Sequence, residues 1–350
     1  MFRVTRLATA ILAGALVLTA CGGDDDAAEP EGTGSESSAP ASDIKVGLAY
    51  DIGGRGDQSF NDAAAAGLDK AKTDLGIEAT EVEAAQGEPE SAKEERLRLL
   101  AQNGFNPVIG VGFAYSASLA KVAKEFPDTN FAIIDDAGAV GPNIANLTFA
   151  EHEGSFLVGA AAALKSKTGN IGFVGGVEVP LIKKFEAGYA AGAKAVKPDI
   201  EIQSRYLTQP PDFSGFGDPA KGKTAAEGMY QGGADVVYQA AGGSGGGVFE
   251  AAQAAGTMAI GVDSDQALTA AEGVRGVIIT SMLKKVDVAV FDFITTVTED
   301  NFQSGEVVYD LEADGVGYST TGGQVDDIAA QLDDYKAKII SGEIEVPTAP

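Results

Sequence analysis

The sequence predicts an α/β protein with two doubly wound lobes, each built on a parallel sheet and joined to the other by a hinge. From Ile44 onward, short and nearly continuous apolar runs alternate with longer amphipathic segments. Continuous apolar runs are typical of parallel strands that helices cover on both faces. The alternation restarts after about residue 150, and the chain beyond Ile44 is long enough for two domains of ordinary size.

The first lobe is expected over residues 44–150. Its apolar runs and amphipathic segments follow one another in a βαβαβαβ order, which predicts parallel strands with crossover helices. The expected strands are 44–50, 77–82, 107–111 and 131–134, and the expected helices are 62–75, 90–102 and 116–126.

The second lobe is expected over residues 151–281. A helix over 285–298 follows it, so we expect the chain to return to the first lobe over about residues 282–302, with part of 303–350 in the second lobe. The sequence leaves open which lobe the stretch from Val307 joins. The expected helices are 153–165, 181–196, 219–231 and 246–255, and the expected strands are 171–174, 200–206, 236–238, 258–262 and 277–281.

The N-terminus reads as an export signal. Two arginines, Arg3 and Arg6, precede an apolar stretch over 7–20 that is too short to span a bilayer as a helix. The run 18–21 ends in Cys21, the single cysteine, and resembles the lipobox of bacterial lipoproteins, in which the cysteine is acylated. We expect residues 1–20 to be a lipoprotein signal peptide and Cys21 to carry the lipid. An ordinary signal peptide with a coincidental cysteine is the alternative.

Residues 21–43 are expected to form a disordered acidic tether. They are rich in aspartate, glutamate, glycine, serine and proline, and this composition buries too little apolar surface to offset the entropy of the chain. Because the chain has one cysteine, no intramolecular disulfide can form, and the folded body rests on its core alone.

The chain is strongly acidic. It has 25 Lys and Arg against 51 Asp and Glu, a net charge of −26. Binding to nucleic acid requires a basic surface that neutralises phosphates, so nucleic acid is not an expected partner. The same charge disfavours direct adhesion to anionic lipid, and membrane attachment would depend on the acyl chains.

A glycine-rich turn opens the first predicted helix at residues 51–61. Such a turn can hold a phosphate, but this one fits neither a Walker A loop nor a dinucleotide fingerprint, and Asp51 and Asp57 would repel an anion. Carboxylates here suit hydroxyl or amine donors. Ligands of open parallel sheets bind beyond the carboxyl ends of the strands, so we expect a site in the cleft between the lobes.

An ordered set of motifs resembles a known family. Taken together, the motifs resemble the basic membrane protein (Bmp, PnrA-like) family of ABC transporter substrate-binding lipoproteins, of which well-studied members bind purine nucleosides. The resemblance implies a type I periplasmic-binding-protein-like fold. The motifs are Asp51 with DQSFN at 57–61, IID at 133–135, EGSFLVG at 153–159, GFVGG at 172–176, DPAKGK at 218–223, AGGSG at 241–245, GVDSDQ at 261–266 and SMLK at 281–284.

The resemblance implies a set of ligand-binding residues. Phe60 and Phe216 would stack on opposite faces of a base, with Phe213 as the alternative second ring, and Asp263 and Lys284 would bind the ribose. The alternative for this last pair is an internal salt bridge. Asp51 and Asp135 would lie near the base, with Asp136 competing with Asp135, whereas Asp265 is expected to be a loop residue. Other implied ligand-binding residues are Ser59, Asn61, Gly242 and Gly243.

These observations predict a monomeric lipoprotein on the extracytoplasmic face of the cell membrane, which binds a purine nucleoside between its lobes and delivers it to the permease of an ABC importer. Closure is expected through strands near Ala150, Ser281 and Asn301. No cofactor, metal or catalytic residue is expected, since the single His152 lies between two glutamates and no Cys/His set exists for zinc. The alternatives are a binder of another planar ring with a polyol tail, such as riboflavin, a surface sensor or adhesin, and an extracellular enzyme.

Overall fold

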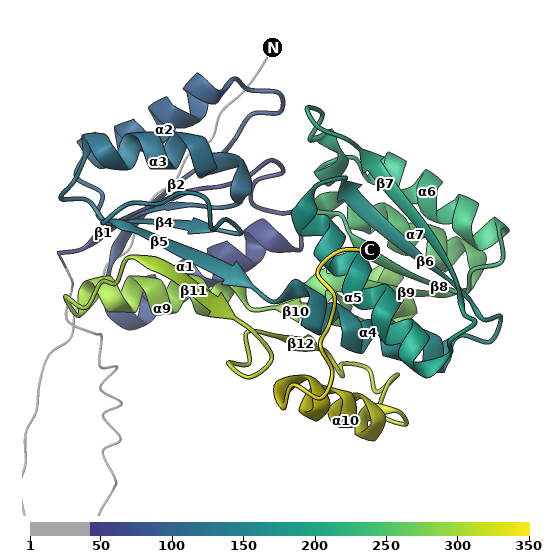
Figure 1. Cartoon of the computed structure of the whole chain (residues 1–350). Coiled ribbons are helices and arrows are strands. Elements are labelled where there is room, and N and C mark those ends of the chain that lie inside the picture. Colours follow the sequence, from purple (N-terminus) through teal and green to yellow (C-terminus); the bar gives the residue numbers. More distant parts are fainter. Residues whose placement is uncertain (1–42) are drawn as a thin grey trace, which may run out of the picture. The chain divides into compact units, whose positions relative to one another are not determined.

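Two six-stranded sheets organise the described residues, 43–350, of the computed structural model (Figure 1). Helices cover both faces of each sheet, which confirms the predicted pair of doubly wound α/β lobes. The expected signal peptide, the lipid-bearing Cys21 and nearly all of the tether lie outside the described residues.

The first sheet has the strand order β11-β5-β4-β3-β1-β2, and its paired strands all run parallel. Packed helix pairs flank it, α1 with α9 and α2 with α3. Its strands are β1 (Lys45–Ala49), β2 (Glu78–Val82), β3 (Val108–Gly110), β4 (Phe131–Ile134), β5 (Ile144–Phe149) and β11 (Gly305–Tyr309). Its helices are α1 (Phe60–Leu75), α2 (Glu90–Gln102), η1 (Phe113–Tyr115), α3 (Ser116–Glu125) and α9 (Val286–Thr298).

The second sheet repeats this order as β12-β10-β9-β8-β6-β7, but its edge strand β12 is antiparallel to β10. Helices α4 with α5 and α6 with α7 flank it, and α10 packs on α4. Its strands are β6 (Asn170–Val177), β7 (Glu201–Thr208), β8 (Val236–Ala240), β9 (Met258–Asp263), β10 (Ile278–Lys284) and β12 (Val316–Tyr318). Its helices are α4 (Glu151–Lys165), α5 (Pro180–Val196), η2 (Ser214–Phe216), α6 (Pro219–Gln231), η3 (Gly242–Ser244), α7 (Gly245–Ala255), α8 (Gln266–Thr269), η4 (Glu272–Val277) and α10 (Ala329–Ile340).

The chain passes between the lobes at three places: at Ala150, at Lys285 and over 310–315. Two hydrogen bonds tie these crossings together, from Ala150 N to Tyr309 O (3.0 Å) and from Lys285 N to Gly315 O (2.9 Å). Of the three expected hinge positions, Ala150 lies at a crossing. Ser281 and Asn301 do not, since Ser281 lies within β10 and Asn301 lies between two elements of the first lobe.

The expected lobe boundaries near the C-terminus also need correction. Residues 282–284 belong to the second sheet rather than to the returning segment. They are the last residues of β10, and they pair with the edge strand β12. The returning segment continues to Tyr309, since β11 pairs with β5 in the first sheet. The stretch from Val307 therefore contributes to both lobes, and a local pattern could not show these pairings.

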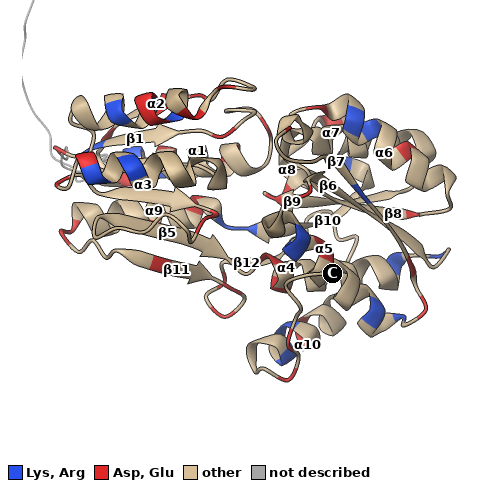
Figure 2. Ribbon diagram, turned by 45° about the horizontal axis from the view of Figure 1, so that its top comes forward, with Lys and Arg blue, Asp and Glu red and all other residues tan. Residues whose placement is uncertain are grey.

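Charged residues are spread over the helices and loops of both lobes (Figure 2). On α2 and α3, basic residues alternate with acidic ones and form ion pairs such as Lys121–Glu94 (2.6 Å) and Arg98–Glu125 (2.7 Å). Pairing of this kind neutralises the basic side chains of that face. Within residues 43–350, no helix is both long and apolar enough to cross a bilayer.

Candidate ligand-binding site

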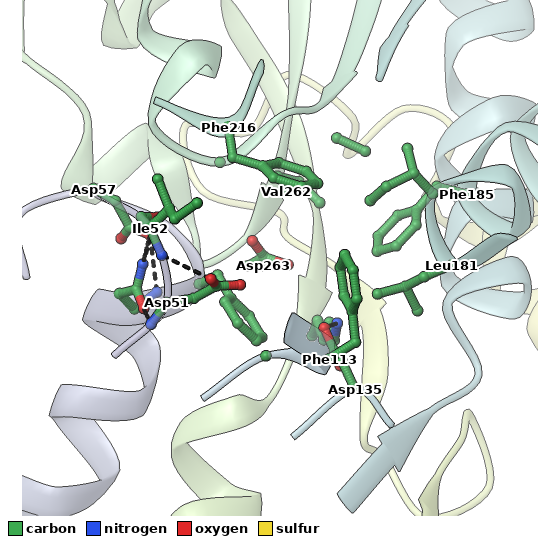
Figure 3. A pocket seen from close by; sticks show the side chains of 17 residues that line it. Asp51, Ile52, Asp57, Phe113, Asp135, Leu181, Phe185, Phe216, Val262 and Asp263 are labelled. Atoms are coloured by element: carbon green, nitrogen blue, oxygen red, sulfur yellow. Dashed lines mark hydrogen bonds and ion pairs between the residues drawn. The ribbon is translucent and has the colours of Figure 1, made fainter. Parts of the chain in front are cut away.

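The carboxyl ends of strands from both sheets meet around one cavity (Figure 3). It has about 590 Å³ of empty space, counting the part that opens to solvent. The residues that line it are Asp51, Ile52, Asp57, Phe60, Asn61, Gly112, Phe113, Asp135, Leu181, Ile182, Phe185, Phe216, Ala240, Gly242, Val262, Asp263 and Lys284.

Most of the residues predicted from the sequence line this cavity. Two of the ten do not: Ser59 is fully buried behind it, and Gly243 lies beside Asp57 and the carbonyl of Phe216. The eight that do are Asp51, Phe60, Asn61, Asp135, Phe216, Gly242, Asp263 and Lys284.

The turn before α1 is held by its own side chains. The carboxylate of Asp57 accepts hydrogen bonds from the backbone N–H groups of Ser59, Asn61 and Asp62 at 2.9–3.1 Å. It therefore caps the helix, a role for which an acidic side chain suits both the free N–H groups and the helix dipole. Phe60 is the first residue of this capped helix, and its side chain lines the cavity.

Asp51 follows β1 and lies against the backbone of Gly112. A Cβ atom at Gly112 would come within 2.4 Å of Asp51 Oδ2, and Gly112 has a φ of 96°, so both space and backbone conformation require glycine there. One carboxylate oxygen accepts the N–H of Ile52 at 2.7 Å. Burial nevertheless raises the pKa of Asp51 to about 6, because it disfavours the charged form.

The ring of Phe216 enters the cavity from the second lobe. It packs on the end of β6, where a Cβ atom at Gly176 would come within 2.4 Å of a ring carbon. The alternative ring, Phe213, does not line this cavity. Instead it contacts Phe113 of the first lobe, with 6.1 Å between ring centroids. Phe216, and not Phe213, thus lines the cavity together with Phe60.

Lys284 ends β10 and is almost fully buried, with 2% of its side chain exposed. Its Nζ lies 2.6 Å from Asp135 Oδ2 and 3.4 Å from Glu151 Oε1, and the rings of Phe60 and Phe149 are each 5.0 Å away. Burial disfavours the ammonium, but the neighbouring carboxylates outweigh it and raise the pKa of Lys284. The salt bridge considered between Lys284 and Asp263 does not form. Asp135 takes that place because it projects from the first lobe toward the end of β10.

Asp135 directly follows β4 and Asp263 is the last residue of β9, and these two strands have equivalent places in the two sheets. Both have left-handed backbones, with φ of 66° and 62°, a conformation that aspartate tolerates better than most residues. Burial raises the pKa of Asp263 to about 6, and burial also raises the pKa of Asp135 against the opposing effect of Lys284. Asp135 Oδ1 is buried without a hydrogen-bond partner, so it is an acceptor available to a ligand.

The competing acidic residues have structural roles. The carboxylate of Asp136 accepts hydrogen bonds from Ser116 Oγ and from the N–H groups of Gly138 and Ala139. Asp265 accepts a hydrogen bond from Thr321 Oγ1 in the loop before α8. Neither residue lines the cavity. No group of three or more His, Cys, Asp or Glu side chains in residues 43–350 is placed to hold a metal ion.

Behind the cavity, residues 58–59 of the first lobe contact residues 263–269 of the second. Ser59 Oγ donates to Asp263 Oδ2 at 2.5 Å, and Gln266 Nε2 donates to the carbonyl of Gln58 at 2.9 Å. The side chain of Gln266 is oriented in turn, because its Oε1 accepts hydrogen bonds from Gln239 Nε2 (2.8 Å) and from the N–H of Val262 (2.9 Å). Ser59 is therefore a positioning residue for Asp263.

Sequence reasoning missed an apolar wall. Leu181, Ile182 and Phe185 come from the first turns of α5, and Phe113 follows β3. Ligands of parallel sheets bind beyond the carboxyl ends of the strands, so the position of Phe113 after β3 could have drawn attention to it. No local signal marks the three residues of α5, since an apolar helix face is ordinarily part of the core.

The chain matches the family model described as ABC transporter substrate-binding protein PnrA-like over residues 44–349. It belongs to this family. The nucleoside-binding protein BmpA of an ABC transporter of Lactococcus lactis is 33% identical over 99% of both chains. Basic membrane protein A1 of Borrelia garinii is 34% identical over 87% of this chain and 88% of its own.

Solved structures agree with the assignment to the Bmp family. A solute-binding protein of an ABC transporter system from Aeropyrum pernix superposes with a TM-score of 0.77 at 31% identity, covering 87% of this chain and 93% of its own. The protein is therefore an ABC transporter substrate-binding protein with a two-lobed solute-binding fold.

Proposed function

We propose that this substrate-binding protein captures a purine nucleoside between its lobes and delivers it to the permease of an ABC importer. The observation that carries the proposal is the pair of phenyl rings, Phe60 from the first lobe and Phe216 from the second, lining one cavity together with buried carboxylates. The nucleoside-binding relative from Lactococcus lactis supports the same ligand class.

The two rings suit a flat heterocycle. Stacking of one base on an aromatic ring contributes about 1–3 kcal/mol. Because the rings come from different lobes, a base can contact both only when the lobes are closed. The ligand would then favour the closed form through contacts that the open form lacks.

The carboxylates suit the hydroxyl and N–H groups of a nucleoside. Ionised Asp135 and Asp263 can only accept hydrogen bonds, and Asp135 Oδ1 has no partner in the protein. A ribose or a ring N–H supplies the donors, and hydrogen bonds to charged groups contribute about 1.5–3 kcal/mol each. Four carboxylates line the cavity against one lysine, so a phosphate group would be repelled. We therefore expect nucleosides rather than nucleotides.

Titration calorimetry tests this proposal. Guanosine, inosine or adenosine should bind with micromolar or tighter affinity, and the corresponding 5′-monophosphate should bind far more weakly. Phe60→Ala should lose most of the affinity while the protein stays folded, as judged by circular dichroism. Absence of both heat and thermal shift with all three nucleosides would reject the proposal.

We also propose attachment to the extracytoplasmic face of the membrane through a lipid on Cys21. The support is the lipobox-like run at 18–21 and the name of the Borrelia garinii relative, a basic membrane protein. Cys21→Ser should move the protein from the membrane fraction to the soluble fraction. Retention of that variant on the membrane would contradict the lipid anchor.

A further inference from the structure

A second cavity adjoins the ligand cavity. It encloses about 890 Å³ of empty space, counting its open part, and lies between the loop after β2 (residues 84–88) and the loop after β7 (residues 211–214). Four residues line both cavities and form the wall between them: Asp51, Ile52, Phe113 and Phe216. We call the two spaces the inner cavity and the outer cavity.

A pair of aromatic rings from opposite lobes supports this wall. Phe113 lines both cavities, whereas Phe213 lines the outer cavity alone. Their centroids are 6.1 Å apart with an interplanar angle of 57°, so the ring of Phe213 packs behind that of Phe113. Phe213 therefore packs against Phe113 on the side of the outer cavity.

The charged groups of the outer cavity already have partners. Glu88 accepts hydrogen bonds from Arg96 and from the N–H of Ala85, and Lys93 donates to the carbonyl of Ala114 at 2.9 Å. The carboxylates of Asp51 and Asp212 accept backbone N–H groups of Ile52 and Ser214. Alanines, Pro211 and three phenylalanines make up much of the remaining surface. The outer cavity is therefore suited to an uncharged, largely apolar group rather than to a phosphate or an ammonium.

The wall faces one end of the proposed ligand. Of the residues that we assign to the base, Asp51 and Phe216 line both cavities, and Phe60 and Asp135 line the inner cavity alone. Asp263 and Lys284, which we assign to the sugar, do not line the outer cavity. This orientation rests on the proposed function. It directs substituents on the base, and not those on the sugar, toward the wall.

We propose that Phe213 is a specificity-determining residue: by holding Phe113 in place, it limits the ligand to a base without a bulky substituent. Truncation of Phe213 would let Phe113 move and join the two cavities. An aryl group on an exocyclic amine of the purine would then occupy the outer cavity, where apolar side chains and aromatic rings can receive it.

Calorimetry with the full-length protein in detergent tests this inference. The ligands are adenosine and guanosine, their N6-benzyl and N2-benzyl derivatives, and the matched 5′-O-benzyl nucleosides. In the wild type, the base-substituted ligand should bind about 100-fold more weakly than its parent, because overfilling a packed site is costly. In Phe213→Ala the ratio of the two dissociation constants, base-substituted ligand over parent, should fall to about 10 or less. The same ratio for the 5′-O-benzyl ligand should stay as in the wild type.

Phe213→Leu is the matched control. It keeps most of the bulk behind Phe113, so its ratio should remain near that of the wild type. Binding of the parent nucleoside shows that each variant is folded. An unchanged ratio in Phe213→Ala, or equal binding of parent and base-substituted ligand by the wild type, would overturn the inference and leave the proposed function intact. Absence of binding of any nucleoside to the wild type would overturn both.

Discussion

The two lobes share one strand order but supply different surfaces to the cavity. β1 to β5 of the first lobe correspond in sheet position to β6 to β10 of the second. The first lobe contributes most of the polar wall, including Asp51, Asp57, Asn61 and Asp135, and the second contributes most of the apolar wall, including Leu181, Ile182, Phe185 and Val262. The shared architecture fixes where side chains point, and the residues at equivalent strand ends decide what they bind.

The strand ends of β4 and β9 show this division most clearly. Asp135 and Asp263 have the same backbone conformation, but Asp135 forms an ion pair with Lys284, whereas Asp263 accepts a hydrogen bond from Ser59. Both bonds join the lobes. Equivalent positions in the fold therefore differ in electrostatic role.

The largest expected effect distinguishes these two aspartates. Asp135→Asn should lower the free energy of unfolding by about 3 kcal/mol, because it leaves the buried ammonium of Lys284 without its 2.6 Å partner. Asp263→Asn should cost about 1 kcal/mol, since an amide oxygen can still accept from Ser59. Urea denaturation of both variants without ligand measures the difference. Equal losses would show that the two positions are electrostatically alike.

The second comparison sets the two stacking rings against each other. Phe60→Ala should weaken nucleoside binding by about 2–3 kcal/mol and Phe216→Ala by about 1–2 kcal/mol. The larger loss is expected for Phe60 because its ring also lies 5.0 Å from Lys284 Nζ and shields that group. Calorimetry with one nucleoside gives both values, and leucine at each position serves as the control for bulk. A larger loss of affinity in Phe216→Ala than in Phe60→Ala would show that the ring of the second lobe contributes more to binding.

The third prediction uses one carboxylate from each lobe. Asp51 and Asp263 both have pKa values raised to about 6 by burial, above their ordinary value of 3.8. Nucleoside affinity should fall as the pH drops from 7 to 5, because protonated carboxyls lose the charge that accepts ligand donors. Stability should respond in the opposite direction. The folded state binds these two protons more tightly than the unfolded state, so the two groups stabilise the fold as the pH falls from 7 toward 4.

Isosteric variants isolate each carboxylate. Asp51→Asn should remove part of the pH dependence of affinity and of stability. Between pH 7 and 4, the change in the free energy of unfolding should become smaller by about 1–2 kcal/mol. Asp263→Asn should have a similar effect. Calorimetry and urea denaturation across this pH range provide the two readouts. If neither variant alters the pH profile, the titrating groups lie elsewhere.

The smallest expected effect concerns closure of the lobes. Gln266→Ala removes the hydrogen bond to the carbonyl of Gln58, which is worth about 0.5–1.5 kcal/mol, without changing a residue that lines the cavity. It also removes the acceptor of Gln239 Nε2 and of the N–H of Val262, both within the second lobe. Affinity should fall by about three- to tenfold, and small-angle scattering of the ligand-free protein should show a larger radius of gyration. Thr269→Val, which loses long contacts to the same carbonyl (3.4 Å) and to the carbonyl of Asp265 (3.5 Å), is the control. An unchanged radius together with unchanged affinity would show that this contact does not bias closure.

The sequence alone determined most of the helices and buried strands. Helices α2 and α6 and strand β4 have the predicted bounds. Local signals mark the ends of α6, where Asp218 caps the helix before Pro219 and Gly232 ends it. Strand β5 was missed, since Asn146 and Thr148 interrupt its apolar run. Both are buried, and their side chains are satisfied by Ala139 O and Glu306, which no local pattern reveals.

The sequence also provided, through motif resemblance, eight of the residues that line the cavity. Only the tertiary structure decided how these residues pair: Lys284 with Asp135, Ser59 with Asp263, and Phe213 with Phe113. The crossings between the lobes and the place of β11 and β12 were decided there as well. The physical reason is the same in each case. Periodicity and capping act over a few residues, whereas ion pairs, ring contacts and edge-strand pairing join segments that lie far apart in the chain.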